Sequence, residues 1–283
     1  MDALVLEGLL SPPVLAVLGL CIGSFLNVVI HRVPLMLERA WRAESAELLG
    51  VPAEVGEPIS LSKPASRCPS CGHRIRWHEN IPVLGYLRLR GRCSACKTPI
   101  SPRYPLVEVF TGIVFAAIGW RFGAVPVALL WCGVAATLIA LAGIDWDTTF
   151  LPDTLTLPLL WAGLVAAALG WTLPLADALW GAVAGYLSLW SVYWMFKLLT
   201  GKEGMGFGDF KLLAALGAWL GLKMILPIVL LASLIGAVVG IAMKLNASLR
   251  EGRYVPFGPF LAGAGLAVML AGPARVLGWI GWA

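Results

Sequence analysis

The stretch Gly206-Phe207-Gly208-Asp209 places a carboxylate at the start of an apolar segment. A second carboxylate, Asp145, lies earlier in the chain, in the run Ala142-Gly143-Ile144-Asp145-Trp146-Asp147 at the end of another apolar segment. Carboxylates within membrane segments are expensive to desolvate and are functional-site candidates by default. We therefore expect Asp145 and Asp209 to act as a pair.

The composition is that of a membrane protein. Hydrophobic residues make up 59% of the chain and charged residues 13%, and the mean hydropathy is +0.84, which excludes an ordinary soluble domain. The net charge of +5 could indicate nucleic acid, but basic residues in the loops of a membrane protein more often set its orientation. We expect a lipid bilayer as partner and no nucleic acid.

The hydrophobic runs predict an all-α polytopic membrane protein with about eight transmembrane helices, since a span needs about twenty apolar residues. Met1–Leu10 has no basic region, so the first run is expected to be retained rather than cleaved. The sixth run is short and bracketed by Lys211 and Lys223, which leaves six or seven spans with a re-entrant segment as an alternative. The candidates are 12–30, 105–121, 124–143, 155–171, 176–199, 209–221, 224–244 and 256–280.

The basic residues predict the orientation. If residues 31–104 are cytoplasmic, alternation through eight spans places eighteen of the twenty-one Lys and Arg in the cytoplasm, among them Arg250 and Arg253. Both termini then lie outside, and Asp145 and Asp209 both reach the cytoplasmic face. The predicted organisation is a first span (1–34), a cytoplasmic loop (35–104) and a membrane core (105–283).

The cytoplasmic loop carries two Cys-x-x-Cys pairs, which predict a zinc site between the first two spans. Two such pairs can deliver four thiolates to the corners of a tetrahedron, as in structural zinc sites. Disulfides are the alternative, but a cytoplasmic loop is reducing. His73 and His78 are further possible ligands, and we expect neither to bind. The predicted ligands are Cys68, Cys71, Cys93 and Cys96.

Several other residues leave alternatives open. Trp41–Leu49 allows a short amphipathic helix on the membrane surface, although a variable insertion is favoured. Glu108 is either a carboxylate satisfied by a loop arginine or an accessory group of the active site. Asp153 follows a proline and is expected to cap the next span at Thr154. For Asp209, an N-cap role competes with the functional one.

The pair of aspartates favours peptide hydrolysis without a metal or a nucleophilic side chain. Two neighbouring carboxyls cannot both ionise, so they share a proton and titrate as a pair, and one can take a proton from water while the other donates one. A Ser-His or Cys-His nucleophile is not indicated, because the three histidines lie near the first loop. Neither aspartate is individually assigned as acid or base.

At these residues the sequence resembles the bacterial type IV prepilin peptidase/N-methyltransferase family, one of the Gly-x-Gly-Asp aspartic membrane proteases. The similarity covers nearly the whole chain and keeps several motifs in order. They are Gly23–Pro34, the two Cys pairs, Ile81–Tyr86, Tyr104–Glu108, Asp145 with Leu151–Asp153, and Gly206–Lys211.

The resemblance implies a bifunctional enzyme of the bacterial inner membrane. Asp145 and Asp209 would cleave the basic leader of prepilins and pseudopilins on the cytoplasmic side. Members with the Cys-bearing loop also methylate the new N-terminal residue with S-adenosylmethionine, and this chain keeps both Cys pairs. The sequence has no Gly-rich nucleotide fingerprint, so the S-adenosylmethionine site is not assigned, and Glu108 and Gly23–Pro34 are its candidates.

Three alternatives remain open from the sequence. Intramembrane acids and many glycines are also features of transporters, although no convincing inverted repeat supports that class. A zinc-dependent scaffold without activity would use the aspartates only as caps or paired charges. A peptidase without methyl transfer is the third, although the family members that only cleave lack the Cys-bearing loop.

Overall fold

The computed structural model describes residues 7–52, 58–245 and 255–282, and within these ranges its regular structure is helical apart from two isolated β-bridges. This confirms an all-α protein. Arg250, Arg253 and part of the predicted loop, residues 53–57, lie outside the described residues. The elements are α2 (Pro12–Leu49), η1 (Trp77–Glu79), α3 (Leu84–Arg88), α4 (Arg103–Phe122), α5 (Val127–Thr148), α6 (Asp153–Ala168), α7 (Leu175–Thr200), α8 (Phe207–Leu220), η2 (Leu222–Met224), α9 (Ile225–Leu245), α10 (Gly258–Ala271) and α11 (Pro273–Trp279).

Among the described residues, five helices are long and apolar enough to cross a membrane. They are α2, α4, α5, α7 and the stretch Leu222–Leu245, and the pair α10 and α11, bent by 99°, makes up to six. Helices α6 and α8 have only 16 and 14 residues. At about 1.5 Å per residue they are shorter than a hydrocarbon core of about 30 Å. A polytopic membrane protein is therefore supported, but eight full-length spans are not confirmed.

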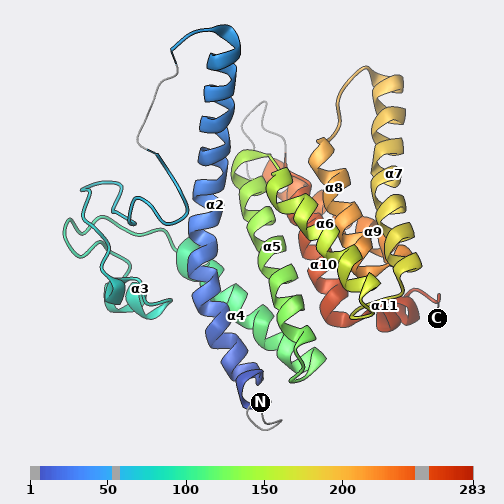
Figure 1. Cartoon of the computed structure of the whole chain (residues 1–283), viewed down its shortest axis with the longest axis horizontal. Helices are drawn as coiled ribbons and strands as arrows, with labels where there is room; N and C mark the ends of the chain where they lie inside the picture. The colour runs from blue at the N-terminus through green and yellow to red at the C-terminus, as the bar shows by residue number, and fades with distance from the viewer. Residues whose placement is uncertain (1–6, 53–57, 246–254, 283) are drawn as a thin grey trace. The chain divides into compact units, whose positions relative to one another are not determined.

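The chain forms two compact units, residues 1–136 and 137–283, and each is described by itself. In the first unit α2 packs along α4 (Figure 1). Glycines make this approach possible, because a Cβ at Gly19 would lie 2.7 Å from the carbonyl oxygen of Thr111. Small residues at such contacts let helix backbones come close in membrane proteins. The predicted boundaries at residues 34 and 104 stay predictions.

Helix α2 continues beyond Pro34 to Leu49, so Trp41–Leu49 forms its last turns rather than a separate short helix. The reason lies in the sequence, because residues 35–49 contain no glycine or proline and are rich in Leu, Ala, Glu and Arg, which favour helix. An ion pair between Arg42 and Glu38 at 2.6 Å adds local support. Gly50, in the left-handed conformation, ends the helix.

The second unit is built around α8, whose residues from Asp209 to Leu220 are all buried except Lys211. Helices α6, α7 and α10 pack against it (Figure 1). Gly181 of α7 and Gly217 of α8 bring the two backbones into direct contact, since a Cβ on either would overlap the carbonyl of the other. The indole N–H of Trp219 donates to the Leu159 carbonyl at 2.8 Å and ties α8 to α6.

Candidate functional site

Asp145 and Asp209 are both buried in the second unit, with 5% and 7% of their surface exposed. Asp145 lies near the end of α5, and Asp209 lies in the first turn of α8. The two carboxyls interact electrostatically. The structure therefore brings together the two aspartates that the sequence singled out.

Leu151 and Gly258 connect the surroundings of the two aspartates. The backbone N–H of Gly258, the first residue of α10, donates to Asp145 Oδ2 at 3.0 Å. A Cβ at Gly258 would lie 2.6 Å from that oxygen, so only glycine allows the close approach. The Leu151 side chain reaches Gly258 and also Gly208, where a Cβ would lie 2.7 Å from Leu151 Cβ. Three segments thus converge on the pair: the end of α5, the start of α8 and the start of α10.

Neither Asp153, which was expected to cap a helix, nor Asp209, for which capping was the alternative, is an N-cap residue. Gly206 is the N-cap of α8, so Asp209, three residues on, does not hold that position. For α6 the N-cap is Pro152, and Asp153 is the first residue of the helix, so it does not hold the capping position. The prediction that Asp153 caps at Thr154 is therefore wrong. Its carboxylate instead accepts from Lys211 Nζ at 2.7 Å, because Lys211, two residues after Asp209 in α8, lies within its reach.

When two buried carboxyls interact electrostatically, only one of them readily ionises. One can then act as a base while the other acts as an acid. Such a pair can activate a water molecule and polarise a carbonyl group without a metal. The convergence of three helix ends, rather than any single motif, gives the second unit this chemical capacity.

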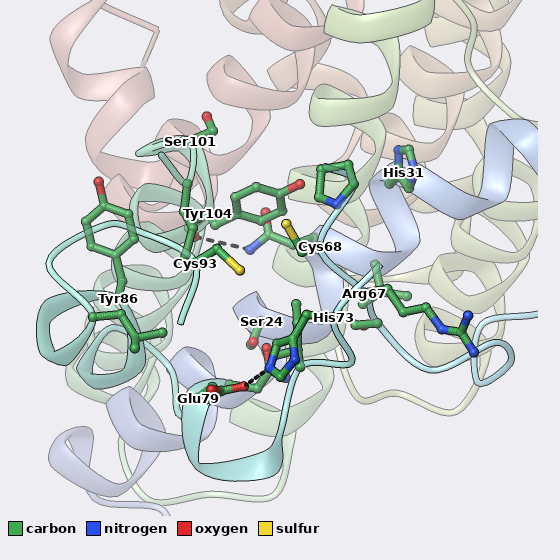
Figure 2. A pocket seen from close by; sticks show the side chains of 18 of the residues that line it. Ser24, His31, Arg67, Cys68, His73, Glu79, Tyr86, Cys93, Ser101 and Tyr104 are labelled. Carbon is green, nitrogen blue, oxygen red and sulfur yellow. Dashed lines mark hydrogen bonds and ion pairs between the residues drawn. The ribbon is translucent and has the colours of Figure 1, made fainter. Parts of the chain in front are cut away.

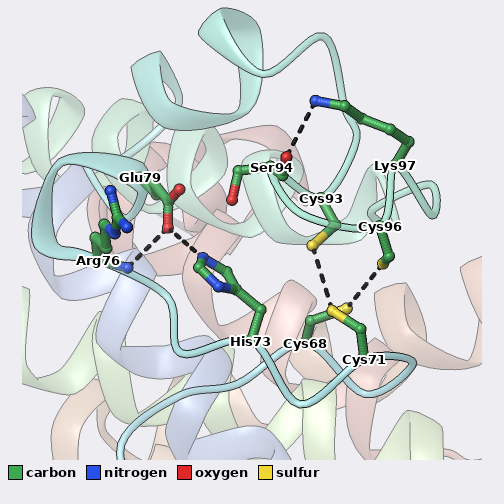
Figure 3. A network of polar contacts seen from close by, with 9 residues as sticks. All are labelled: Cys68, Cys71, His73, Arg76, Glu79, Cys93, Ser94, Cys96 and Lys97. Carbon is green, nitrogen blue, oxygen red and sulfur yellow. Dashed lines mark hydrogen bonds and ion pairs between the residues drawn. The ribbon is translucent and has the colours of Figure 1, made fainter.

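Four cysteines form the one cluster of metal-ligating side chains found among the described residues, and all four Sγ atoms lie within 4.8 Å of one another (Figure 3). Two separations are 3.7 Å for Cys68 and Cys96 and 3.9 Å for Cys71 and Cys93. All four are free thiols, so the disulfide alternative is not realised. The cluster can hold a metal ion.

The two Cys pairs adopt the same backbone geometry. The N–H of Cys68 donates to His73 O, and the N–H of Cys93 donates to Thr98 O, both at 2.9 Å. In each pair the residue four positions on, Gly72 or Lys97, returns a hydrogen bond to the first cysteine. Both of these residues have positive φ, 71° and 62°. Two matching turns therefore present the four thiols.

The histidines of the loop lie apart from the cysteine cluster. His73 Nε2 is 3.4 Å from Glu79 Oε2, and the His78 ring packs edge-on against Trp77 (Figure 3 shows the His73 contact). The backbone N–H of Arg76 donates to Glu79 Oε2 at 2.8 Å and is the main reason that the pKa of Glu79 falls to about 2. Hydrogen bonds with Thr98 lower the pKa of Cys96 to about 6, which favours the thiolate that binds metals.

Glu108 lies in the first unit and is 8% exposed. Its Oε2 accepts the backbone N–H of Val83 at 2.7 Å, and a loop arginine, one of the two alternatives, is not observed as its partner among the described residues. Val83 has φ 60° and ψ −49°, a strained γ-turn for a β-branched residue, closed by the Leu84 N–H on Pro82 O at 2.6 Å. Glu108 therefore helps to hold a strained turn in the cysteine-bearing loop.

Sequence reasoning missed the role of Gly258. The pair Gly258-Pro259 does mark a helix start, because proline is favoured in the first helical turn. Nothing in the sequence connects it with Asp145, which lies 113 positions away. Only the folded arrangement shows that this helix end holds the carboxylate.

Comparisons with known proteins identify relatives that cover most of the chain. Family models for the bacterial peptidase A24 N-terminal domain and the type IV leader peptidase family match residues 17–122 and 132–241. Proteins named prepilin leader peptidase/N-methyltransferase from Pseudomonas putida and Stutzerimonas stutzeri are 54% and 53% identical, over 90% of this chain and 89% of theirs. One from Pseudomonas aeruginosa is 52% identical, over 90% and 88%. No solved structure matches the chain. The resemblance inferred from the motifs is confirmed, and the chain belongs to the type IV leader peptidase family.

Proposed function

We propose that this chain cleaves the leader peptide from prepilins and pseudopilins and methylates the N-terminal residue that cleavage exposes. The observation that carries the proposal is the meeting of two buried aspartates, Asp145 and Asp209, at the ends of α5 and α8. The names of relatives more than half identical to this chain support both activities. It is then an aspartic endopeptidase and an S-adenosylmethionine-dependent methyltransferase.

In the peptidase reaction Asp145 and Asp209 work with one shared proton. The ionised carboxyl takes a proton from water while the water oxygen attacks the scissile carbonyl carbon, and the neutral carboxyl donates its proton to the carbonyl oxygen. A proton then passes to the amine nitrogen as the carbon–nitrogen bond breaks. The N–H of Gly258 holds the Asp145 carboxylate in place throughout.

The active site faces the cytoplasm at the inner membrane. Eighteen of the twenty-one Lys and Arg fall on that side if eight segments alternate, with α6 and α8 as short crossings. In that alternation the end of α5 and the starts of α8 and α10 reach the same face, which agrees with their convergence at Asp145 and Asp209. A prepilin has a polar leader followed by an apolar helix, so its cleavage point lies at this interface.

Zinc is the metal that suits the four-cysteine cluster. A tetrahedral zinc with bonds of about 2.3 Å to sulfur requires sulfur atoms about 3.8 Å apart. The separations of 3.7 and 3.9 Å fit that requirement. Cys68, Cys71, Cys93 and Cys96 would be the ligands, in a structural site closed to further ligands.

The retained cysteine cluster favours the bifunctional enzyme over a peptidase without methyl transfer. S-adenosylmethionine supplies a methyl group on a positively charged sulfur, and a neutral amine is its acceptor. The family assignment speaks against the transporter alternative and against an inactive zinc scaffold.

Replacing Asp145 or Asp209 by Asn should abolish leader cleavage, because the one remaining carboxyl cannot act as base and acid in the same step. We expect a loss of at least about 100-fold. The measurement is incubation of purified enzyme with a prepilin, followed by mass spectrometry for loss of the leader and gain of a methyl group. Asp177→Asn, in the first turn of α7, is the matched control. Unchanged cleavage at normal protein level would remove either aspartate from the mechanism.

Cys68→Ser should lower bound zinc and methylation more than it lowers cleavage, since the cysteine cluster and the aspartate pair lie in different units. Metal content of purified protein and both activities are measured on the same preparation. Cys21→Ser changes a cysteine on α2 outside the cluster and should affect none of the three. Equal loss of cleavage and methylation would argue against a separate transfer site.

Substitutions at Gly72 and Lys97 should change the zinc affinity in different ways. A side chain at positive φ costs about 1–2 kcal/mol, so Gly72→Val should weaken zinc binding roughly tenfold while Lys97→Gly should preserve or strengthen it. A Cβ at Gly72 would meet no atom within 4 Å, so the change isolates backbone conformation. Competition with a chelating dye measures the affinity. A loss of affinity in both variants would contradict the matched-turn geometry.

A further inference from the structure

A cavity of about 700 Å³ lies in the first unit, between α2, the cysteine-bearing loop and the start of α4 (Figure 2). Its volume is within the range of about 300–1,000 Å³ typical of small-molecule sites. Ser24, Asn27 and His31 line it from α2, and Glu108 lines it from α4. The two sequence candidates for a cofactor site, Glu108 and Gly23–Pro34, thus meet around one cavity.

Glu108 gives the cavity a buried carboxylate with capacity for a ligand. Only one hydrogen bond to its carboxylate is observed within the described part of the chain, from the Val83 N–H to Oε2. A carboxylate can accept about four hydrogen bonds, so further acceptor sites remain. Burying this charge without more partners is costly, which points to a donor or a cation that arrives with a ligand.

Glu79 supplies a second carboxylate on the cavity wall, held by the N–H of Arg76 and facing His73. The side chain of Asn27, on the cavity wall, is also held by hydrogen bonds. Asn27 Nδ2 donates to the carbonyls of Gly23 and Tyr104, at 3.2 and 3.1 Å. The cavity is therefore organised in advance, which reduces the entropy lost on binding.

The loop that closes one side of the cavity is tied to α2 by Arg32. Its guanidinium donates to the carbonyl oxygens of Ser60, Leu61 and Pro64, at 2.8, 3.4 and 2.7 Å. These hydrogen bonds direct the positive charge to the loop backbone. Arg67, which is exposed, also lines the cavity and can receive an anionic group, whereas the two glutamates can receive a cationic one.

Apolar side chains complete the lining. Val28, Ile75 and Ile100 belong to three different segments, and all three are partly buried. Such a wall suits a flat, weakly polar ring system, whereas the carboxylates suit hydroxyl groups and positive charges. The ligand that fits is a cation of intermediate size with an aromatic part.

We propose that this cavity is the S-adenosylmethionine site, with Glu108 and Glu79 receiving the polar and cationic groups and the apolar wall receiving the adenine. The assignment rests on the proposed methyltransferase function. Cys68 and Cys93 also line the cavity, so the metal cluster shapes one of its walls. This explains why loss of the metal should affect methylation more than cleavage.

The test is binding of S-adenosylmethionine to purified full-length protein, measured by equilibrium dialysis without pilin. Glu108→Gln keeps an oxygen for the Val83 N–H but removes the charge, and should weaken binding at least tenfold. Ser24→Phe adds bulk to the cavity from α2 and should weaken it as strongly. Glu44→Gln, an exposed change on α2 away from the cavity, should bind as the unaltered chain does. Leader cleavage by each variant reports that the second unit is folded, and metal bound by the cysteine cluster reports that the first unit is folded.

The outcomes separate this assignment from the proposed function. Normal binding by folded Glu108→Gln and Ser24→Phe protein overturns the site while methyl transfer itself stands. If these variants bind S-adenosylmethionine normally but have a raised KM for pilin, the cavity binds the pilin that accepts the methyl group. That result also overturns the assignment. If the unaltered chain neither binds S-adenosylmethionine nor methylates pilin, the proposed methyl transfer fails and this site falls with it. Should Glu108→Gln not fold, Ser24→Phe decides between the outcomes.

Discussion

The second unit depends on the burial of two carboxyls in an otherwise apolar helical bundle. An ionised carboxylate removed from water costs several kcal/mol unless it is paired or hydrogen-bonded, and two neighbouring carboxylates cannot both ionise cheaply. The structure meets this constraint at helix ends rather than in helix interiors. Asp145 lies near the end of α5 and Asp209 in the first turn of α8, and the first N–H of α10 donates a hydrogen bond to Asp145. The proposed hydrolysis would then take place at helix ends and would not require a helix to unwind.

The first unit must bring four thiols, which are negatively charged when they bind a metal, close to one another. Two turns with the same hydrogen bonds bring four thiols within 4.8 Å of one another. The cavity beside them is closed by α2 and by the strained Val83 turn that Glu108 holds. Each unit therefore contains the side chains proposed for one of the two reactions. When a residue in one unit is substituted, the reaction assigned to the other unit serves as the control.

The sequence predicted the helical class, the four-cysteine cluster and the aspartate pair, because hydropathy, Cys spacing and isolated intramembrane acids are local signals. It also marked the run that forms α8 as short, but it counted the run that forms α6 as an ordinary span, since apolar runs do not show where a helix begins. The contact of Asp145 with Gly258 and that of Glu108 with Val83 join distant segments and leave no local pattern. Asp153 was misjudged for the same reason, as its partner Lys211 lies 58 positions away.

The central claim is that Asp145 and Asp209 interact, and a double-mutant cycle on stability tests it most directly. Unfolding midpoints of the unaltered protein, both single Asn variants and the double variant are measured in one detergent at one pH. Residues in contact are coupled by about 0.5–3 kcal/mol, whereas sites more than about 7–10 Å apart add within about 0.5 kcal/mol. We predict that the two single shifts do not sum to the double shift. Simple additivity would contradict the account.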